Sequence, residues 1–199
     1  MPALTIGLLA DTHLPHRLKQ LPKEVLDALA GVDLILHAGD VDDPASLAPL
    51  EAIAPVRAVR GNFHVTDLAG GSADLPAAIE MELAGKRIVV THGHLPGPIG
   101  FAIKGVLIAA KGLRLIDNGT INRWMTRRLK RRYPQADVIV FGHSHLAHVT
   151  QIEGTLLVNP GAVYVTGKEQ PTVARMRLGV DGPEVEIIQL GTCNPRRKT

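Results

Sequence analysis

The sequence predicts an α/β protein with two packed sheets, and two observations support this fold class. In the early part of the chain, short apolar runs alternate with helix-like stretches, which favours a β-α-β-α-β opening with helices packed against a sheet. In the late part, strand-like runs follow one another around turn signals, which suggests that a second sheet packs on the first. The length of 199 residues, with 45% hydrophobic and 21% charged residues, fits one globular domain, here residues 1–190.

The strands expected first are continuous apolar runs bounded by turn residues, as in buried strands. One helix is expected from Pro22 to Ala30, where Leu and Val recur at helical spacing and Gly31 follows the end. A similar pattern runs from Pro44 to Ile53. The five apolar runs are Leu4–Ala10, Leu34–Leu36, Val56–Val59, Ile88–Val90 and Val138–Phe141.

The late part of the chain is expected to form two hairpins, each with a turn that contains glycine. The tail, residues 191–199, is expected to fray. The first hairpin joins His148–Glu153 to Thr155–Val158, and the second joins Thr172–Leu178 to Glu184–Leu190.

A basic segment, residues 100–135, interrupts this plan. It holds nine Lys or Arg against the single acid Asp117, so it carries +8 while the whole chain has a net charge of +3. We interpret it as two amphipathic helices, Phe101–Ile116 and Asn122–Tyr133, inserted between strands. Several roles stay open for it: a solvated hairpin, a lid that recruits a phosphate-rich ligand, a surface for nucleic acid or an acidic membrane, or the contact of a homo-oligomer.

The single cysteine, Cys193, excludes an internal disulfide framework and a metal cluster built on cysteines. A reducing cytoplasm is therefore the expected location. The apolar run Leu4–Ala10 has no basic residues before it and is too short to span a membrane, so we interpret it as a strand and expect no stable membrane insertion.

Each of the five apolar runs ends in polar residues that can bind a metal. Loops after the carboxyl ends of strands line the ligand crevice of α/β sheets, so these residues are expected to meet there. One such ending is weak, because Asp-x-His also suits a turn with a helix cap. However, five of the nine histidines fall at these ends, and His143 and His145 alternate as two metal ligands would. The residues are Asp11, His13, Asp40, Asn62, His92, His94, His143 and His145.

In this order the motifs resemble those of the calcineurin-like metallophosphoesterase superfamily, over residues from about 6 to 165. The pattern of that family is Asp-x-His, Gly-Asp, Gly-Asn, His and Gly-His-x-His. The short length and the Asn159-Pro160-Gly161 turn are most similar to the small prokaryotic phosphodiesterase subfamily, which usually has Ser where this chain has Ala162. The motifs are Asp11/His13, Gly39/Asp40, Gly61/Asn62, His92 and Gly142/His143/His145.

The resemblance implies a four-layer αββα sandwich of two mixed β-sheets and a centre with two divalent metals. It implies that Asp40 bridges the metals. The first metal is then bound by Asp11, His13 and His145, and the second by Asn62, His92 and His143. So many imidazoles suit borderline ions, with Mn²⁺ expected first and Fe²⁺, Ni²⁺ or Zn²⁺ as alternatives, better than Mg²⁺ or Ca²⁺.

The implied activity is hydrolysis of a small phosphate ester or nucleotide-like substrate, more readily a diester than a monoester, by a hydroxide that bridges two metals. Asn62, His94, Arg127 and Arg128 are the expected substrate contacts. Two alternatives stay open. One is a phosphatase or nuclease. The other is a binding scaffold such as the retromer subunit of this fold, although scaffolds tend to lose metal ligands and this chain keeps all of those expected.

One stretch departs from the family. Where many members have His and then an acid after Gly-Asn, this chain has Phe63 and His64. Three interpretations follow. His64 donates the leaving-group proton, another donor such as His94 or water does so, or the site has no efficient donor and turns over poorly. In the third case hydrolysis is slowed by about 10²–10⁴-fold, the typical contribution of a general acid, but is not abolished. We favour the second.

Overall fold

The structure is a computed structural model that describes residues 3–61, 74–94, 106, 116–165 and 169–191. Within these residues, ten strands form two five-stranded sheets. The first sheet has the strand order β10-β9-β1-β2-β3 and the second has the order β4-β5-β6-β8-β7. The strands of the first sheet are β1 (Leu4–Leu9), β2 (Leu34–His37), β3 (Val56–Ala58), β9 (Thr172–Gly179) and β10 (Gly182–Gln189). Those of the second are β4 (Ala78–Leu83), β5 (Lys86–Thr91), β6 (Val138–Val140), β7 (His148–Ile152) and β8 (Thr155–Asn159).

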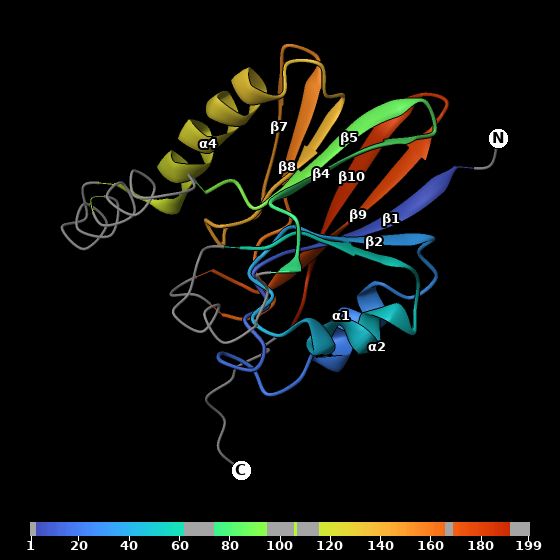
Figure 1. The fold of residues 1–199 in the computed structure, drawn as a ribbon, viewed down its shortest axis with the longest axis vertical. Helices are drawn as coiled ribbons and strands as arrows, with labels where there is room; N and C mark the ends of the chain where they lie inside the picture. Colours follow the sequence, from blue (N-terminus) through green and yellow to red (C-terminus); the bar gives the residue numbers. More distant parts are fainter. Residues whose placement is uncertain (1–2, 62–73, 95–105, 107–115, 166–168, 192–199) are drawn as a thin grey trace.

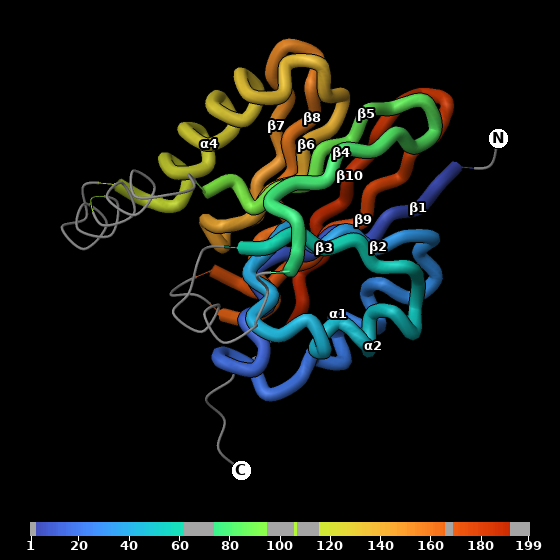
Figure 2. The backbone as a smooth tube through the Cα atoms, in the orientation of Figure 1, coloured from blue at the N-terminus to red at the C-terminus, as the bar shows by residue number. Residues whose placement is uncertain are grey.

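The two predicted hairpins form, but they do not make a sheet of their own. The β7–β8 hairpin joins β4, β5 and β6 in the second sheet. The β9–β10 hairpin instead extends the first sheet, because β9 pairs antiparallel with β1. Figure 2 shows this return of the chain, with the red strands β9 and β10 beside the blue strand β1. A second sheet does pack on the first, but of the late strands only β7 and β8 belong to it, and β9 and β10 belong to the first.

Three apolar clusters separate four layers. Ile6 and Leu8 of β1 pack with Val90 and Val140 between the two sheets. A second cluster, which includes Val25, fills the space between the first sheet and its helices, and a third, which includes Met125, lies under the last helix. Figure 1 shows α1 and α2 along the first sheet and α4 along the second. The predicted αββα sandwich is confirmed, with helical pieces α1 (Lys23–Ala28), η1 (Pro44–Leu47), α2 (Ala48–Glu51) and α4 (Asn118–Arg132).

Helix α4 is the described part of the basic segment. Asp117 caps its N-terminus, accepting a hydrogen bond from the backbone N–H of Thr120 at 2.6 Å. The helix forms the fourth layer of the sandwich, so its buried face is part of the body. The helix predicted for Phe101–Ile116 lies almost entirely outside the described residues, as does the tail after residue 191, and the insertion stays a prediction for that part. No helix within the described ranges is long and apolar enough to cross a membrane.

Candidate metal centre

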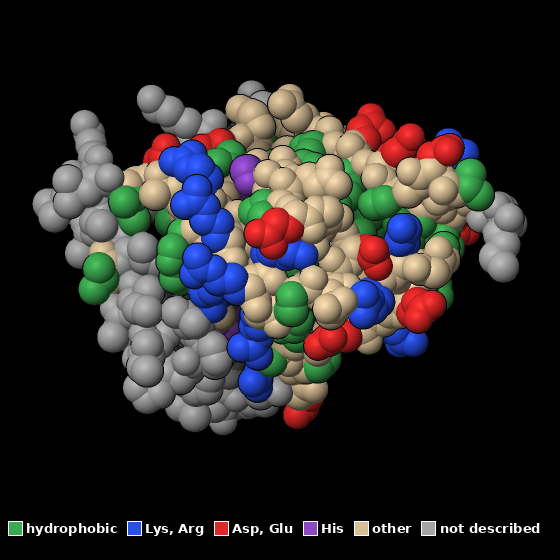
Figure 3. Space-filling model, turned by 90° about the horizontal axis from the view of Figure 1, so that it is seen from above, with side chains coloured by type: hydrophobic (Ala, Val, Ile, Leu, Met, Phe, Trp, Pro, Cys, Tyr) green, Lys and Arg blue, Asp and Glu red, His purple; other side chains and the backbone are tan. Residues whose placement is uncertain are grey.

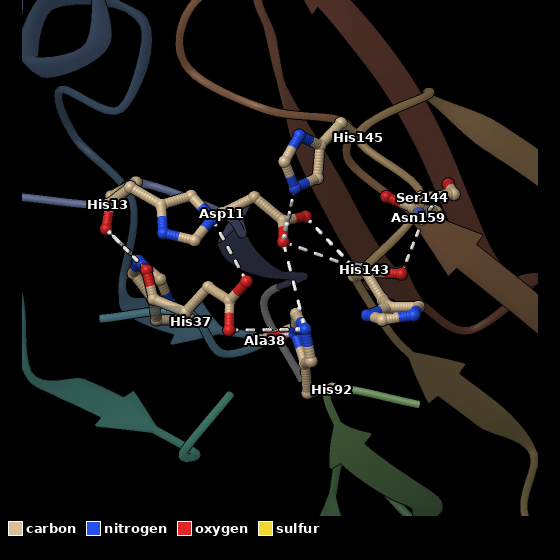
Figure 4. A network of polar contacts seen from close by, with 12 residues as sticks. Asp11, His13, His37, Ala38, His92, His143, Ser144, His145 and Asn159 are labelled. Atoms are coloured by element: carbon tan, nitrogen blue, oxygen red, sulfur yellow. Dashed lines mark hydrogen bonds and ion pairs between the residues drawn. The ribbon is translucent and has the colours of Figure 1, made fainter. Parts of the chain in front are cut away.

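The ends of strands from both sheets meet at one place. The loop after β1 is tied to the loop after β2, because the N–H groups of Asp11 and His13 donate to the carbonyls of Gly39 and Asp40 at 2.9 and 3.0 Å. The loops after β5 and β6 are joined from Gly142 N–H to His92 O at 3.3 Å. Figure 4 shows the polar side chains of these loops turned toward one another. The expected crevice is thus built between two sheets rather than along one.

Four side chains form a compact group that can hold a metal ion. One ligand atom from each of them lies within 4.8 Å of all the others. The group combines two carboxylates with two imidazoles, a donor set that suits a borderline divalent ion. Its members are Asp11, His13, Asp40 and His145, which are the ligands expected for the first metal together with the expected bridge.

The carboxylate of Asp40 faces two groups of histidines at once. Its Oδ2 lies 3.0 Å from Nε2 of His13, and its Oδ1 lies 3.4 Å from Nε2 of His92. The ring of His92 has its centroid 5.2 Å from that of His143, so the expected second-metal histidines are neighbours. Asn62, the remaining expected ligand of that metal, lies outside the described residues, as do Phe63 and His64.

Three imidazoles are held so that Nε2 faces the carboxylates. Nδ1 of His92 donates to the carbonyl of Ala38 at 2.9 Å, and Nδ1 of His13 bonds to Asp42 Oδ1 at 3.2 Å. Nδ1 of His145 lies 3.3 Å from the hydroxyl of Tyr164. Metal-binding histidines are commonly fixed in this way, with the nitrogen remote from the metal bound to a carbonyl, carboxylate or similar partner. The arrangement therefore fits a metal centre.

Burial and mutual charge shift the pKa values of the candidate ligands. Burial and the neighbouring Asp40 raise the pKa of Asp11 well above its ordinary value. Burial opposes protonation of His13, but its hydrogen bonds to Asp40 and Asp42 outweigh this and raise the pKa of His13 to about 10. Burial lowers the pKa of His143 to about 3, which keeps that imidazole neutral and able to bind a metal. A divalent cation beside these carboxylates would compete with protonation of His13.

The backbone at these residues is held in an unusual conformation. Five of the candidate ligands have a positive φ, which costs free energy in residues other than glycine and persists only where the surroundings impose it. The other positive-φ residues of this kind in the described ranges, Ala84 and Glu153, lie in hairpin turns. The five ligands are Asp11 (52°), His13 (46°), Asp40 (56°), His143 (77°) and His145 (61°).

Supporting residues around the centre were not all found in the sequence. His37 is fully buried and bonds to Thr12 Oγ1 at 3.1 Å, and burial lowers its pKa to about 3. Asp42 also accepts from His16 at 2.7 Å, and the two histidines lower its pKa against the opposing effect of burial. The position of Asp42, two residues after Asp40, could have indicated its supporting role, whereas no sequence pattern indicated that of Tyr164.

The expected substrate contacts fall in different places. The ring of His94 lies 5.6 Å from that of His92, and burial lowers its pKa to about 4. Arg128 donates to the carbonyl of Gly93, between these two histidines, and stacks 5.1 Å from the Trp124 ring centroid.

Arg127 instead lies on the exposed face of α4, without a contact to the ligand loops among the described residues. Arg123 and Arg131 share that face. Figure 3 shows a band of Lys and Arg side chains on the face seen from above, with further Lys and Arg side chains scattered beside it. The structure therefore brings Arg128, but not Arg127, to the candidate metal centre.

Comparisons with known proteins agree with this geometry. The sequence model of one protein family, the calcineurin-like phosphoesterase superfamily domain, matches residues 4–180 of this chain. A probable metallophosphoesterase of Methanothermobacter thermautotrophicus is 32% identical over 188 residues, covering 94% of each chain. Solved structures of other proteins share the fold, among them the following two. An archaeal phosphodiesterase has a TM-score of 0.58 at 22% identity, covering 94% of this chain and all of the other. The zinc complex of Vps29 from Entamoeba histolytica has a TM-score of 0.60 at 17% identity, with the same coverage. The chain belongs to the calcineurin-like phosphoesterase superfamily.

Proposed function

We propose that the protein is a metal-dependent phosphodiesterase that uses two divalent ions. The observation that carries this proposal is the position of Asp40, whose two carboxylate oxygens face His13 on one side and His92 on the other. A carboxylate with this placement suits a bridge between two ions. Mn²⁺ is the proposed metal, and Fe²⁺, Ni²⁺ or Zn²⁺ suit the same donors.

The proposed ligands divide into two sets that share Asp40. The first ion is assigned to Asp11, His13 and His145, and the second to His92, His143 and Asn62. Bound ions would supply a hydroxide nucleophile near neutral pH and neutralise the phosphate oxygens. Asp42 and Ala38 hold His13 and His92 in the orientation that this binding needs.

Arg128 and His94 are the proposed substrate contacts beside the ions. The guanidinium of Arg128 is half-buried against the ligand loop and has no acidic partner in the described part of the chain, so an anionic phosphate suits it. The pKa of His94, lowered to about 4, makes its ring neutral near pH 7. In that state it serves as a hydrogen-bond partner for the ester, and a role as acid would require the bound phosphate to raise its pKa.

The scaffold alternative rests on the structural neighbours named Vps29, one of which was solved with zinc. Metal binding alone therefore does not distinguish an enzyme from a scaffold, and turnover does. The composition, with its single cysteine, supports a cytoplasmic location as part of the proposal.

The test compares hydrolysis of bis(p-nitrophenyl) phosphate and p-nitrophenyl phosphate, with Mn²⁺ and with a chelator. We expect faster hydrolysis of the diester, no activity with chelator, and a loss on the order of 10²-fold or more in Asp40→Ala. Asp27→Ala, a change on the surface, is the control. Activity that resists the chelator, or no activity with any of the four metals, would overturn the enzyme proposal. Full turnover in Asp40→Ala would overturn the bridging role.

A further inference from the structure

One residue of α4 reaches the loop that carries two of the candidate metal ligands. Asn122 is fully buried in the face that packs on the second sheet. An amide in that position is costly unless its hydrogen bonds are made. Its Nδ2 donates to the carbonyl of Leu146 at 3.1 Å, and its Oδ1 accepts from the hydroxyl of Ser144 at 2.7 Å. Both partners lie in the loop after β6, one between His143 and His145 and the other directly after them.

Asn159 closes the network from the opposite side. Its Nδ2 lies 3.3 Å from Asn122 Oδ1, 2.9 Å from Ser144 Oγ and 3.0 Å from the carbonyl of Gly142. Figure 4 shows Ser144 and Asn159 directly beside His143. The loop is thus held before, between and after its two histidines by side chains that are themselves buried.

This support is needed because the loop is strained. His143 and His145 have φ values of 77° and 61°, which only a well-determined surrounding can impose on residues with a Cβ. The N–H of His143 also donates to both oxygens of Asp11, at 3.2 and 3.0 Å, so a shift of the loop would move a carboxylate of the centre as well.

The same helix contacts the other ligand loop of the second sheet. Arg128 donates to the carbonyl of Gly93, and a Cβ at Gly93 would collide with the side chain of Met125. Asn122, Met125 and Arg128 are spaced by three residues, so they follow one side of the helix. Helix α4 therefore lies against both the His92–His94 loop and the His143–His145 loop.

We infer that Asn122 is a positioning residue for the metal centre, holding His143 and His145 in their metal-facing conformation from α4. The inference rests on the proposed function, because it concerns the ligands assigned there. Outer contacts of this kind are typically worth about 10–100-fold in metal affinity. The inference assigns to α4 a role beyond packing: its buried amide fixes the geometry of two ligands from outside the centre.

The test measures Mn²⁺ binding to the folded protein by electron paramagnetic resonance, without any substrate. Asn122→Ala is expected to bind Mn²⁺ about tenfold or more weakly than the wild type. Ser144→Ala, which removes only one hydroxyl, is expected to weaken binding less, and it carries the test if Asn122→Ala does not fold. Thr126→Val is the matched control. Thr126 is buried one turn further along α4, and within the described residues its hydroxyl bonds inside the helix, to the carbonyl of Arg123 at 3.1 Å.

The outcomes separate the two claims. Weaker Mn²⁺ binding in Asn122→Ala, or in Ser144→Ala where Asn122→Ala does not fold, supports the positioning role when Thr126→Val binds as the wild type does, even if all variants unfold at a lower temperature. Wild-type affinity in a folded Asn122→Ala, or in Ser144→Ala where Asn122→Ala does not fold, overturns the inference but not the proposed function. An equal loss in Thr126→Val also overturns it, because the effect would then follow general weakening of α4. A wild-type protein that binds no Mn²⁺, Fe²⁺, Ni²⁺ or Zn²⁺ overturns the proposed function and the inference together.

Discussion

Replacing Gly61 with alanine should damage the candidate centre through one methyl group. Gly61 follows β3, and a Cβ built on it would overlap the carboxylate oxygen and the amide nitrogen of Asp40 and lie 2.6 Å from Asp40 Cα. Ordinary contacts between carbon atoms lie at about 3.5–4.0 Å, so Asp40 or the Gly61 loop must move by about 1 Å. A displacement of about 1 Å in a catalytic group can cost on the order of 10²-fold, or about 2.7 kcal/mol of transition-state stabilisation.

We therefore expect kcat/KM of Gly61→Ala for bis(p-nitrophenyl) phosphate with Mn²⁺ to fall about 100-fold or more. The crowding should also cost about 1–3 kcal/mol of stability, which thermal unfolding measures separately. Gly179→Ala is the matched control, because the atom nearest to its added Cβ is 4.0 Å away, at Ala3. Wild-type turnover in a folded Gly61→Ala variant would show that the position of Asp40 is not critical for catalysis.

Three further predictions follow from the surroundings of the centre. Burial lowers the pKa of His37 to about 3, so on acidification the unfolded chain takes up a proton near pH 6.5 and the folded protein does not. Stability is therefore lost as the pH falls: from pH 7.5 to 5.5, the free energy of unfolding in urea should fall by about 1.4 kcal/mol more in the metal-free wild type than in His37→Gln. Equal losses in the two proteins would contradict the buried neutral ring. Asp42→Asn removes the charged partner of His13 and should weaken Mn²⁺ binding, measured by calorimetry, about tenfold or more. Unchanged affinity would exclude this supporting role. Arg128→Gln should raise KM for the diester about tenfold, while exposed Arg131→Gln should not, and equal kinetics in the two variants would argue against the Arg128 contact.

Much of the fold could be predicted because buried strands leave a strong pattern. The continuous apolar runs of β1, β2, β5 and β6 are covered on both faces in the structure, which is why they stand out in the sequence. β4 was missed because it is a half-exposed strand at the end of the second sheet, where glutamates alternate with apolar residues. The division of the late hairpins between the sheets depends on the pairing of β9 with β1 and of β8 with β6, which no local pattern records.

The candidate ligands could be predicted because each follows a strand in the order typical of one family. Their supporting contacts could not, since these join residues that are distant in the sequence. Asn122 and Ser144 are an example: a polar residue inside an amphipathic helix indicates no partner until the helix is placed on the sheet. The positive φ values of the ligands are likewise imposed by the assembled loops, because Asp and His have no local preference strong enough to predict them.

The metal content of the purified protein is the sharpest test of a centre in which Asp40 joins two metals. Wild-type protein and Asp40→Ala would be dialysed against Mn²⁺, and the bound metal measured per chain together with hydrolysis of bis(p-nitrophenyl) phosphate. We expect about two ions per wild-type chain, with activity rising as the second site fills. Asp40→Ala should lose both bound metal and activity. Full activity with one ion per chain, or unchanged metal content in Asp40→Ala, would contradict a centre in which Asp40 joins two metals.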